Sequence, residues 1–348
     1  MNYLSPKYNL DVFDYYSKIN FVNNTPPFIK EYENGVVFPF GGEHTVGVFD
    51  SAEFCPGMRT SDEEVVYLGF FSVSHYGVML VDDISRLWYE DGGDKKYIFT
   101  AKDSFETTYL MRFLDLLGIP RDHVEKINVP TRYKCISVPA IAFRHGRYVL
   151  PVFCSIYERM AKGMKVMNIA TYDKIYLTRR RLKKRKEVGE KKIELFFETN
   201  GYRVIALEQY PIEGQAVIMR NAHRIASIEG THAHGIVWRN PENNNQCKQI
   251  ILRKQSEFIP RQMMLNSLWN IETTYIDVFE EPFRGFPITH DRGPFLIRWT
   301  EQIERFARDN NMVIPPYCHK RNVMEYVEYS FKCSLYFIKH HIKKIVKR

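Results

Sequence analysis

The chain has 348 residues, of which 45% are hydrophobic and 14% aromatic, enough to fill one large core or two smaller ones and to exclude general disorder. Its formal net charge of +8 favours an anionic partner, such as a phosphate-bearing ligand, a membrane surface or nucleic acid. The six cysteines form no C-x-x-C pair, which gives no zinc or redox motif and favours a reducing compartment. No stretch reaches ~18 consecutive apolar residues, so we expect no membrane-spanning helix and a cytoplasmic location.

Strands alternate with helices along most of the chain. The first 60 residues hold short apolar runs between Pro and Gly turn signals, which predicts irregular β structure. A first series then predicts strands at 65–71, 96–101, 124–129 and 135–143, and helices at 76–89 and 104–119. A second series predicts helices at 157–166, 190–201, 211–222, 261–270 and 293–310, a helix starting near 234, and strands at 172–178, 202–207, 223–230, 248–253 and 272–279.

This alternation predicts an α/β protein built from βαβ units with parallel sheets. The two series predict two Rossmann-like domains facing a central cleft, over residues 1–150 and 151–317. Residues 318–348 are predicted to form a basic amphipathic C-terminal helix. Ligands of open α/β sheets lie at the carboxyl ends of the strands, so we expect the functional residues at these strand ends.

A cluster of cations follows the strand predicted at 172–178. Arg179 and Arg180 stand directly at the strand end, where guanidinium groups can hold phosphate oxygens bidentately. The basic residues from Lys183 to Lys186 are read as a solvated loop.

The stretch IASIEGTHAHGIVW, residues 225–238, combines an apolar strand with a turn that contains two histidines. Gly230 allows the chain to turn sharply, and a helix starting near His232 would present free N–H groups to an anion. His232 and His234 could contact a phosphate or sugar, form ordinary hydrogen bonds in the turn, or bind a metal. A metal site needs further ligands, and no recognisable spacing supplies them, so no metal is expected.

Two aspartates interrupt the apolar spacing of the helix predicted at 76–89. A partly buried carboxylate there, Asp82 or Asp83, could act as a general base towards a hydroxyl group. The alternative is that one of them caps the helix or pairs with Arg86, three or four residues further on.

The C-terminal segment repeats apolar residues every three or four positions from Val323 to Ile345. From Lys332 onward it holds six Lys or Arg and no acidic residue. Such a helix could lie in an anionic membrane interface, could pack across the domains, or could do both.

Several stretches, taken in order over residues 36–250, resemble glycosyltransferase family 61, especially its members that build bacterial capsular polysaccharide. Residues 76–88, YGVMLVDDISRLW, resemble the family segment Y-G-H-F-L-L-D-x-L-S-R-L-W. The family's Ser-Arg-Arg strand end reads Thr178-Arg179-Arg180, and its Asn-Glu reads Gly189-Glu190. Further matches are Gln215, Ala222 and the glycine-histidine turn Gly230-Thr231-His232.

Two departures from the family pattern concern histidine and glycine positions. Val78 replaces the histidine of the first motif, so any role of that histidine is lost or passes to His75. The family turn His-Gly-Ala-x-x-x-Asn reads HAHGIVW at 232–238, with its glycine moved and its asparagine missing.

The resemblance implies a GT-B fold, with acceptor bound by the first domain and nucleotide sugar by the second, and inversion at the anomeric carbon without a metal or other cofactor. The expected donor is UDP-linked, and the acceptor is a bacterial capsular polysaccharide or glycolipid at the inner face of the plasma membrane. The expected catalytic residues are Asp82, His75 and Glu229. The expected donor-binding residues are Arg179, Arg180, Gly230, Thr231, His232, His234 and Glu190.

Two rival functions remain at this point. A catalytically inactive scaffold of polysaccharide assembly fits the departures at Val78 and at residues 232–238. A nucleic-acid-binding protein fits the charge, but no OB, RRM or helix-turn-helix signature accompanies it, and we expect no nucleic acid partner.

Overall fold

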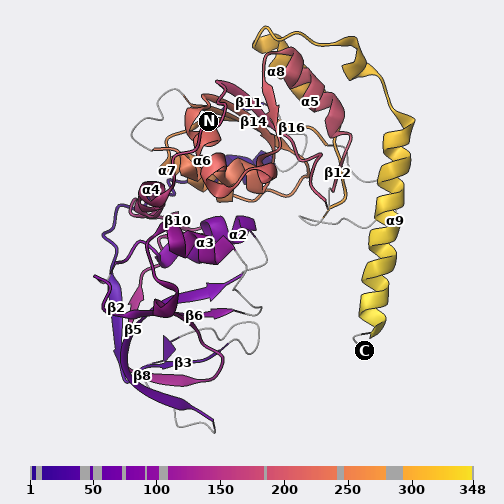
Figure 1. Ribbon diagram of the computed structural model, residues 1–348. Coiled ribbons are helices and arrows are strands. Elements are labelled where there is room, and N and C mark those ends of the chain that lie inside the picture. Colours follow the sequence, from indigo (N-terminus) through magenta and orange to yellow (C-terminus); the bar gives the residue numbers. More distant parts are fainter. Residues whose placement is uncertain are drawn as a thin grey trace. The chain divides into compact units, whose positions relative to one another are not determined.

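The computed structural model describes residues 2–4, 10–39, 48–49, 57–72, 76–90, 92–101, 109–183, 186–240, 247–279 and 293–346. The chain forms two compact units (Figure 1). The middle unit is Asn20–Val166, and the terminal unit combines Met1–Ile19 with Met167–Arg348. The division therefore falls near residue 166 rather than at 150, and the first 19 residues join the terminal unit.

Two local contacts account for this division. Helix α4 (Phe153–Gly163) packs on helix α3 (Tyr109–Leu116) of the middle unit. The approach is close, since a Cβ on Gly163 would lie 2.1 Å from the carbonyl oxygen of Leu116. At the other end of the chain, strand β1 (Asn2–Leu4) pairs in parallel with β16 (Glu272–Asp277) and so adds to the sheet of the terminal unit.

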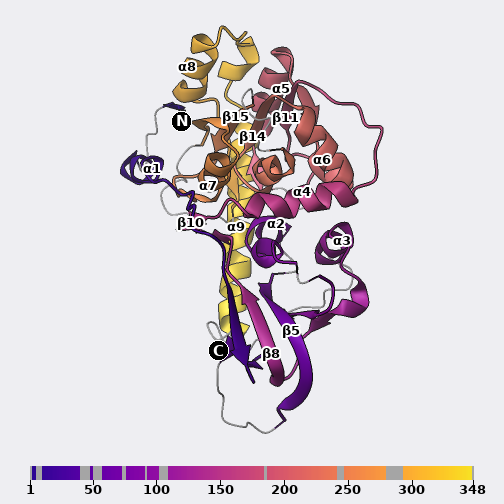
Figure 2. The same cartoon turned by 90° about the vertical axis from the view of Figure 1, so that its left-hand side faces the viewer.

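The sheet of the middle unit is mixed rather than parallel throughout. Its order is β4-β3-β8-β5-β6-β7, with β2 also paired to β8. The long strands β5 and β8 stand out in Figure 2. The parallel part consists of β5 (Arg59–Phe71), β6 (Lys96–Ala101), β7 (Val124–Lys126) and β8 (Thr131–Pro139). The antiparallel part consists of β2 (Ile29–Glu33), β3 (Val36–Val37) and β4 (Val48–Phe49).

The helix predicted at 76–89 is broken at Asp82. Helix α2 (Tyr76–Val81) ends there, and the 3-10 helix η1 (Asp83–Arg86) follows. The break ties the segment to the end of β5, because Oδ2 of Asp83 accepts a hydrogen bond from the backbone N of Ser72 at 2.6 Å. The remaining short elements of this unit are η2 (Arg121–His123), β9 (Phe143–Arg144) and β10 (Tyr148–Val149).

The terminal unit contains a six-stranded parallel sheet in the order β1-β16-β15-β14-β11-β13. Its strands besides β1 and β16 are β11 (Lys174–Leu177), β13 (Arg203–Ile205), β14 (Arg224–Ile228) and β15 (Lys248–Arg253). Counted from β11, the spatial order is 2-1-3-4-5, which is a doubly wound arrangement. The second predicted series of strands and helices is therefore the framework of this unit.

Up to residue 319, the described α-helices of the terminal unit are α1 (Leu10–Ser17), α5 (Glu190–Thr199), α6 (Ile212–Asn221), α7 (Arg261–Leu268) and α8 (Glu301–Asp309). The 3-10 helices in its described residues are η3 (Leu207–Gln209), η4 (Thr231–Trp238) and η7 (Pro316–His319). Strands β12 (Glu187–Val188) and β17 (Phe295–Leu296) form a small parallel pair.

The single helix predicted at 293–310 is wrong. Residues 295 and 296 form β17, and α8 starts only at Glu301. Thr300 sets this start, because its hydroxyl accepts from the backbone N of Ile303 and donates to the carbonyl of Asp277 at 2.5 Å. The apolar residues before Thr300 instead enter the core, where Phe295 and Ile297 are buried.

Helix α9 (Val323–Val346) follows as the long yellow helix of Figure 1. Its first half packs on β12 and β17, where Tyr329 and Cys333 join Val188 and Leu296 in one apolar cluster. Its exposed large apolar side chains are Val323, Met324, Val327, Phe331, Leu335, Phe337, Ile338 and Ile342. Within the described parts of the chain, no helix combines the length and apolar composition that crossing a bilayer requires.

Candidate functional site

The candidate site lies at the carboxyl edge of the parallel sheet in the terminal unit. Strands β11 and β14 are neighbours there, and the strand order reverses between them. This is the position where open α/β sheets hold their ligands, because the chain leaves adjacent strands in opposite directions and opens a crevice. Arg179 follows β11, Gly230 follows β14, and Lys254 follows β15 at the same edge.

Gly230 and Arg179, both predicted from the sequence, lie in close contact. A Cβ on Gly230 would sit 3.0 Å from Nη1 of Arg179 and 3.8 Å from Nζ of Lys254. The φ angle of Gly230 is 138°, a backbone conformation that residues with a side chain rarely adopt. The turn therefore requires glycine for two independent reasons, space and backbone conformation.

Two cations share one buried carboxylate beside this turn. Oε1 of Glu187 lies 2.8 Å from Nε of Arg179 and 3.1 Å from Nζ of Lys254. Burial by itself raises the pKa of Glu187, but the charges of Lys254 and Arg179 outweigh it and lower the pKa to about 2. Glu187 is thus ionised at neutral pH. Burial lowers the pKa of Lys254, whereas the charge of Glu187 acts in the opposite direction. When both cations are protonated, the three side chains carry one net positive charge.

Lys254 and Glu187 were not identified by the sequence reasoning. Lys254 had a usable signal, since it directly follows the strand predicted at 248–253. Glu187 ends a run of basic residues and gives no such signal, because its place depends on β12 pairing with β17, more than a hundred residues away in the chain.

His232 is a neutral imidazole next to these cations. Its side chain is buried, and burial followed by the positive charge of Arg179 lowers its pKa to about 3. Nε2 lies 3.5 Å from Oε2 of Glu208, which is not an ion pair because the ring is uncharged. Nδ1 is buried and has no hydrogen-bond partner among the described residues. One ring nitrogen of a neutral imidazole therefore lies beside the cations, shielded from solvent and without a hydrogen-bond partner in the described residues.

Glu190 holds the backbone of the turn after β11. Its Oε1 accepts hydrogen bonds from the backbone N of Arg179 at 2.9 Å and from the hydroxyl of Tyr176 at 3.0 Å. Burial is the main cause that raises the pKa of Glu190, to about 7. Oε2 has no hydrogen-bond partner within the described residues, so this oxygen can carry the proton. Glu190 therefore positions the backbone of Arg179 and affects the candidate site through that residue.

Arg180 points to a different partner from that of Arg179. Its Nη1 lies 2.6 Å from Oε1 of Glu194 on α5, and the hydroxyl of Thr178 donates to Oε2 of the same carboxylate at 2.6 Å. Arg180 is half-buried and paired, and it flanks the Arg179 cluster as part of a separate ion pair.

Glu229, the candidate carboxylate at the end of β14, is partly exposed as a residue, but its Oε2 is shielded from solvent and has no partner among the described residues. Burial raises the pKa of Glu229, while Arg253 and Lys254 act in the opposite direction. Thr231, which follows Gly230, is half-buried and begins η4.

His234 has a different environment from that of His232. The predicted helix after the turn is a 3-10 helix, and His234 lies within it with Nδ1 2.7 Å from Oε1 of Gln262. Nε2 of Gln262 donates to Gln249 at 3.0 Å and to Asn266 at 2.8 Å. The structure thus favours the hydrogen-bonded alternative for His234, in a buried amide network under the turn.

The middle unit holds the first motif. Asp82 is half-buried between α2 and η1, where its backbone N donates to the carbonyl of Val78 at 2.7 Å. Arg86 donates to the carbonyl of Pro139. His75 lies outside the described residues. Across the part of the chain that the structure describes, no group of three or more His, Cys, Asp or Glu could hold a metal ion.

The terminal unit is thus a doubly wound α/β domain with Arg179 and Lys254 clustered around Glu187 at the carboxyl edge of its sheet. The family model described as Glycosyltransferase 61 matches residues 65–245, more than half of the chain. The chain therefore belongs to glycosyltransferase family 61 and is a glycosyltransferase, which confirms the family resemblance of the motifs. No curated protein matches the sequence. The matched range includes Asp82, Arg179 and His232, whereas Lys254 lies beyond it.

Proposed function

We propose that this glycosyltransferase transfers a hexosyl or pentosyl unit, with inversion and without a metal, from a nucleotide sugar to a bacterial capsular polysaccharide or glycolipid. The donor is expected to be UDP-linked. The proposal includes a GT-B fold, in which the terminal unit binds the donor and the middle unit the acceptor. One observation carries it: Arg179 and Lys254 meet beside Gly230 at the switch point of the doubly wound sheet.

On the donor side, the proposed task is to hold the diphosphate and to stabilise it as it leaves. Negative charge grows on the diphosphate when its bond to the sugar breaks, and preorganised cations in a water-poor site stabilise that charge. Glu187 keeps Arg179 and Lys254 in place before the ligand arrives and leaves one positive charge uncompensated. Neutral His232 can add a hydrogen bond, and Gly230 lets the ligand approach the backbone.

On the acceptor side, the proposed base is Asp82. The acceptor hydroxyl attacks the anomeric carbon from the face opposite the diphosphate, and its proton passes to the base as the new bond forms. His75 is the substitute base. Glu229 is the second candidate carboxylate, but its burial beside Arg253 and Lys254 favours a role in orienting cations.

Helix α9 is proposed to bring the enzyme to the inner face of the plasma membrane. Exposed apolar side chains recur along it at Val327, Phe331, Leu335, Ile338 and Ile342, close to one residue per turn. The sequence from Lys332 onward supplies six basic residues and no acidic one. Apolar insertion together with attraction to anionic lipids is the binding mode of interfacial helices.

The test is a screen of UDP-, GDP-, CMP- and dTDP-linked sugars for slow hydrolysis, with and without EDTA, combined with calorimetric titration of each nucleotide. Binding and hydrolysis of one donor that persist in EDTA support the proposal. Absence of both binding and hydrolysis for every nucleotide contradicts it and favours the inactive scaffold. Binding of oligonucleotides that falls steeply with salt favours the nucleic-acid alternative.

A further inference from the structure

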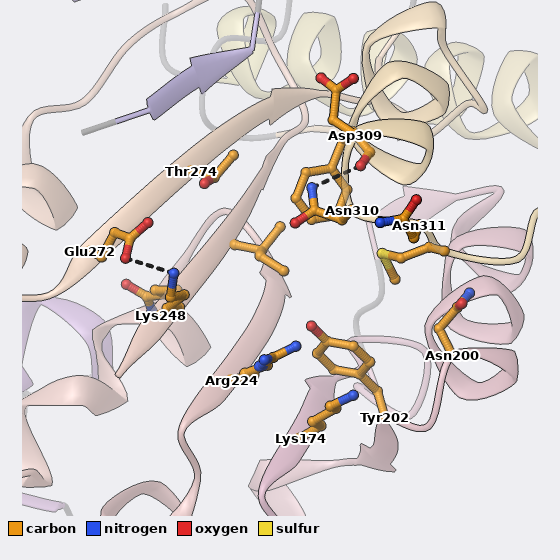
Figure 3. A pocket seen from close by; sticks show the side chains of 14 residues that line it. Lys174, Asn200, Tyr202, Arg224, Lys248, Glu272, Thr274, Asp309, Asn310 and Asn311 are labelled. Atoms are coloured by element: carbon orange, nitrogen blue, oxygen red, sulfur yellow. Dashed lines mark hydrogen bonds and ion pairs between the residues drawn. The ribbon is translucent and has the colours of Figure 1, made fainter. Parts of the chain in front are cut away.

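A pocket lies in the terminal unit, at the amino edge of the parallel sheet. It has a volume of about 550 Å³, within the roughly 300–1,000 Å³ of ordinary small-molecule sites. Residues at the starts of β11, β14, β15 and β16 line one side, and the ends of α5 and α8 line the other (Figure 3). Strand β11 separates this pocket from Arg179 by roughly 13 Å, from its four residues at 3.3 Å each. The pocket is therefore distinct from the candidate donor site.

A row of charged residues heads four neighbouring strands at this edge. Lys174 is the Cα partner of Arg224, Arg224 of Lys248, and Lys248 of Glu272. Adjacent strands lie about 4.8 Å apart, so the row is continuous. Lys248 forms an ion pair with Glu272 at 2.9 Å.

Among the described residues, Lys174 and Arg224 differ from Lys248 in having no carboxylate partner. Within the described residues, neither forms an ion pair, and Nζ of Lys174 lies 5.9 Å from the centre of the Tyr202 ring. Figure 3 shows Lys174, Tyr202 and Arg224 at one end of the pocket. Two neighbouring cations of this kind can share a single carboxylate.

The other end of the pocket limits how much negative charge a ligand can bring. Asp309, Asn310 and Asn311 stand at the carboxyl end of α8, and Asn200 stands at that of α5. Asp309 is already 3.6 Å from Arg305. Each helix end carries about half a negative charge, so two helix ends offset roughly one of the two cations. The remaining positive charge, about one unit, suits a ligand with a single anionic group rather than a polyphosphate.

The rest of the lining suits hydroxyl groups and one apolar face. Asn311 and the exposed carboxylate of Asp309 can exchange hydrogen bonds with hydroxyls, while Phe306 and Ile250 form a buried apolar floor. We propose that this pocket binds a hexuronate, a sugar unit with one carboxylate, through Lys174 and Arg224. The hexuronate is either a free sugar or a unit of a glycan chain, and the site is additional to the donor and acceptor sites.

Calorimetric titration of the full chain with D-glucuronate tests this proposal, with D-glucose and glucose 6-phosphate as comparisons. We expect glucuronate to bind at least tenfold more tightly than either, because glucose lacks the charge and the phosphate carries more than the pocket offsets. A glucuronate-containing disaccharide that binds more tightly than glucuronate identifies a chain unit as the ligand. Equal affinities for the disaccharide and for glucuronate identify the free sugar as the ligand.

Matched variants make the test specific. Lys174→Gln and Arg224→Gln should each weaken glucuronate binding about tenfold to a hundredfold, because each removes one charge-assisted hydrogen bond. Arg203→Gln is the control, since Arg203 starts neighbouring strand β13, stacks on Tyr172 at 5.3 Å and does not line the pocket. UDP binding, measured in parallel, should be unchanged in all three. The proposal is overturned if the wild-type protein does not bind glucuronate, or if glucose or glucose 6-phosphate binds equally well. It is also overturned if Arg203→Gln weakens glucuronate binding as much as the two pocket variants do.

Discussion

Arg179 and Glu187 form a buried ion pair, with Nε and Oε1 2.8 Å apart and side-chain exposures of 14% and 0%. Removing one partner of such a pair normally strands an uncompensated charge and destabilises the fold. Here Lys254 also contacts Glu187, at 3.1 Å. Loss of Arg179 therefore leaves the carboxylate paired, and the guanidinium can be tested for ligand binding without unfolding the domain.

Arg179→Ala should weaken UDP binding about tenfold to a hundredfold, the effect of one charge-assisted hydrogen bond. Arg181→Ala is the matched control, because Arg181 belongs to the same basic run but is exposed. Titration calorimetry of both variants measures the difference. Equal weakening by the two substitutions would mean that only the general charge of the run matters.

Gly230→Ala should destabilise the domain by about 1–3 kcal/mol through backbone strain and should also weaken UDP binding. UDP binding should weaken because the new Cβ would lie 3.0 Å from Nη1 of Arg179 and would displace the guanidinium group. Gly201→Ala is the control, since Gly201 has φ +79° and nothing within 4 Å of a Cβ. It should lower the melting temperature while UDP affinity stays at the wild-type value. An unchanged UDP affinity in Gly230→Ala would separate this turn from the donor site.

Glu190→Gln should alter how stability depends on pH. The pKa of Glu190 is raised from 4.5 to about 7, mainly by burial, so its stabilising contribution is full below about 4.5 and is lost as pH rises through about 7. Up to about 3 kcal/mol of the free energy of unfolding is involved, at 1.36 kcal/mol per pKa unit. Gln keeps the acceptor oxygen for Arg179 and Tyr176 but does not titrate.

Urea unfolding of wild type and Glu190→Gln between pH 4.5 and pH 8 measures this effect. The difference in unfolding free energy should shift in favour of the variant as pH rises. The contribution of His232, whose lowered pKa makes stability fall as pH drops from about 6.5 towards 3, is present in both proteins and cancels. Parallel pH profiles would rule out a raised pKa at Glu190.

Asp82→Asn should lower kcat by about 10²–10⁴, the effect of removing a positioned base, with little change in melting temperature. Asp83→Ala is the contrasting variant, because Oδ2 of Asp83 accepts from the backbone N of Ser72 at 2.6 Å. Its loss should cost about 1–3 kcal/mol of stability by leaving that donor unpaired. Turnover of Asp82→Asn within about tenfold of wild type would exclude Asp82 as the base.

The double substitution Leu335→Ser and Ile338→Ser should reduce binding of the protein to vesicles that contain phosphatidylglycerol. Both side chains are half exposed on α9, at 50% and 52%, and apolar insertion contributes to interfacial binding. Val313→Ser is the control, an exposed apolar side chain outside α9. Cosedimentation at low and high salt gives the measurement. Equal binding by wild type and the double variant, or equal binding to neutral vesicles, would exclude α9 as an anionic-membrane anchor.

The sequence by itself determined most of the local structure of the terminal unit. Buried apolar runs at 175–177 and 225–228 are strands, and Arg179 and Gly230 follow them directly, so both could be placed at the carboxyl edge. Periodicity could not separate β17 from α8, because apolar residues recur at helical spacing across the boundary, at Leu296, Trp299, Ile303 and Phe306. The capping hydroxyl of Thr300 sets the helix start instead.

Only the tertiary structure decided which strand ends meet. Strand β15 lies next to β14, so Lys254 joins Arg179 and Gly230 at one edge, while Glu187 reaches both cations because β12 pairs with β17. His232 and His234 are two positions apart in the sequence, and the 3-10 conformation gives them different environments. Periodicity and turn residues are local properties of the chain, whereas strand order and ion-pair partners depend on packing between distant segments. Most elements, and the site residues Arg179, Gly230 and His232, could therefore be predicted from the sequence. Their association with Lys254 and Glu187 could not.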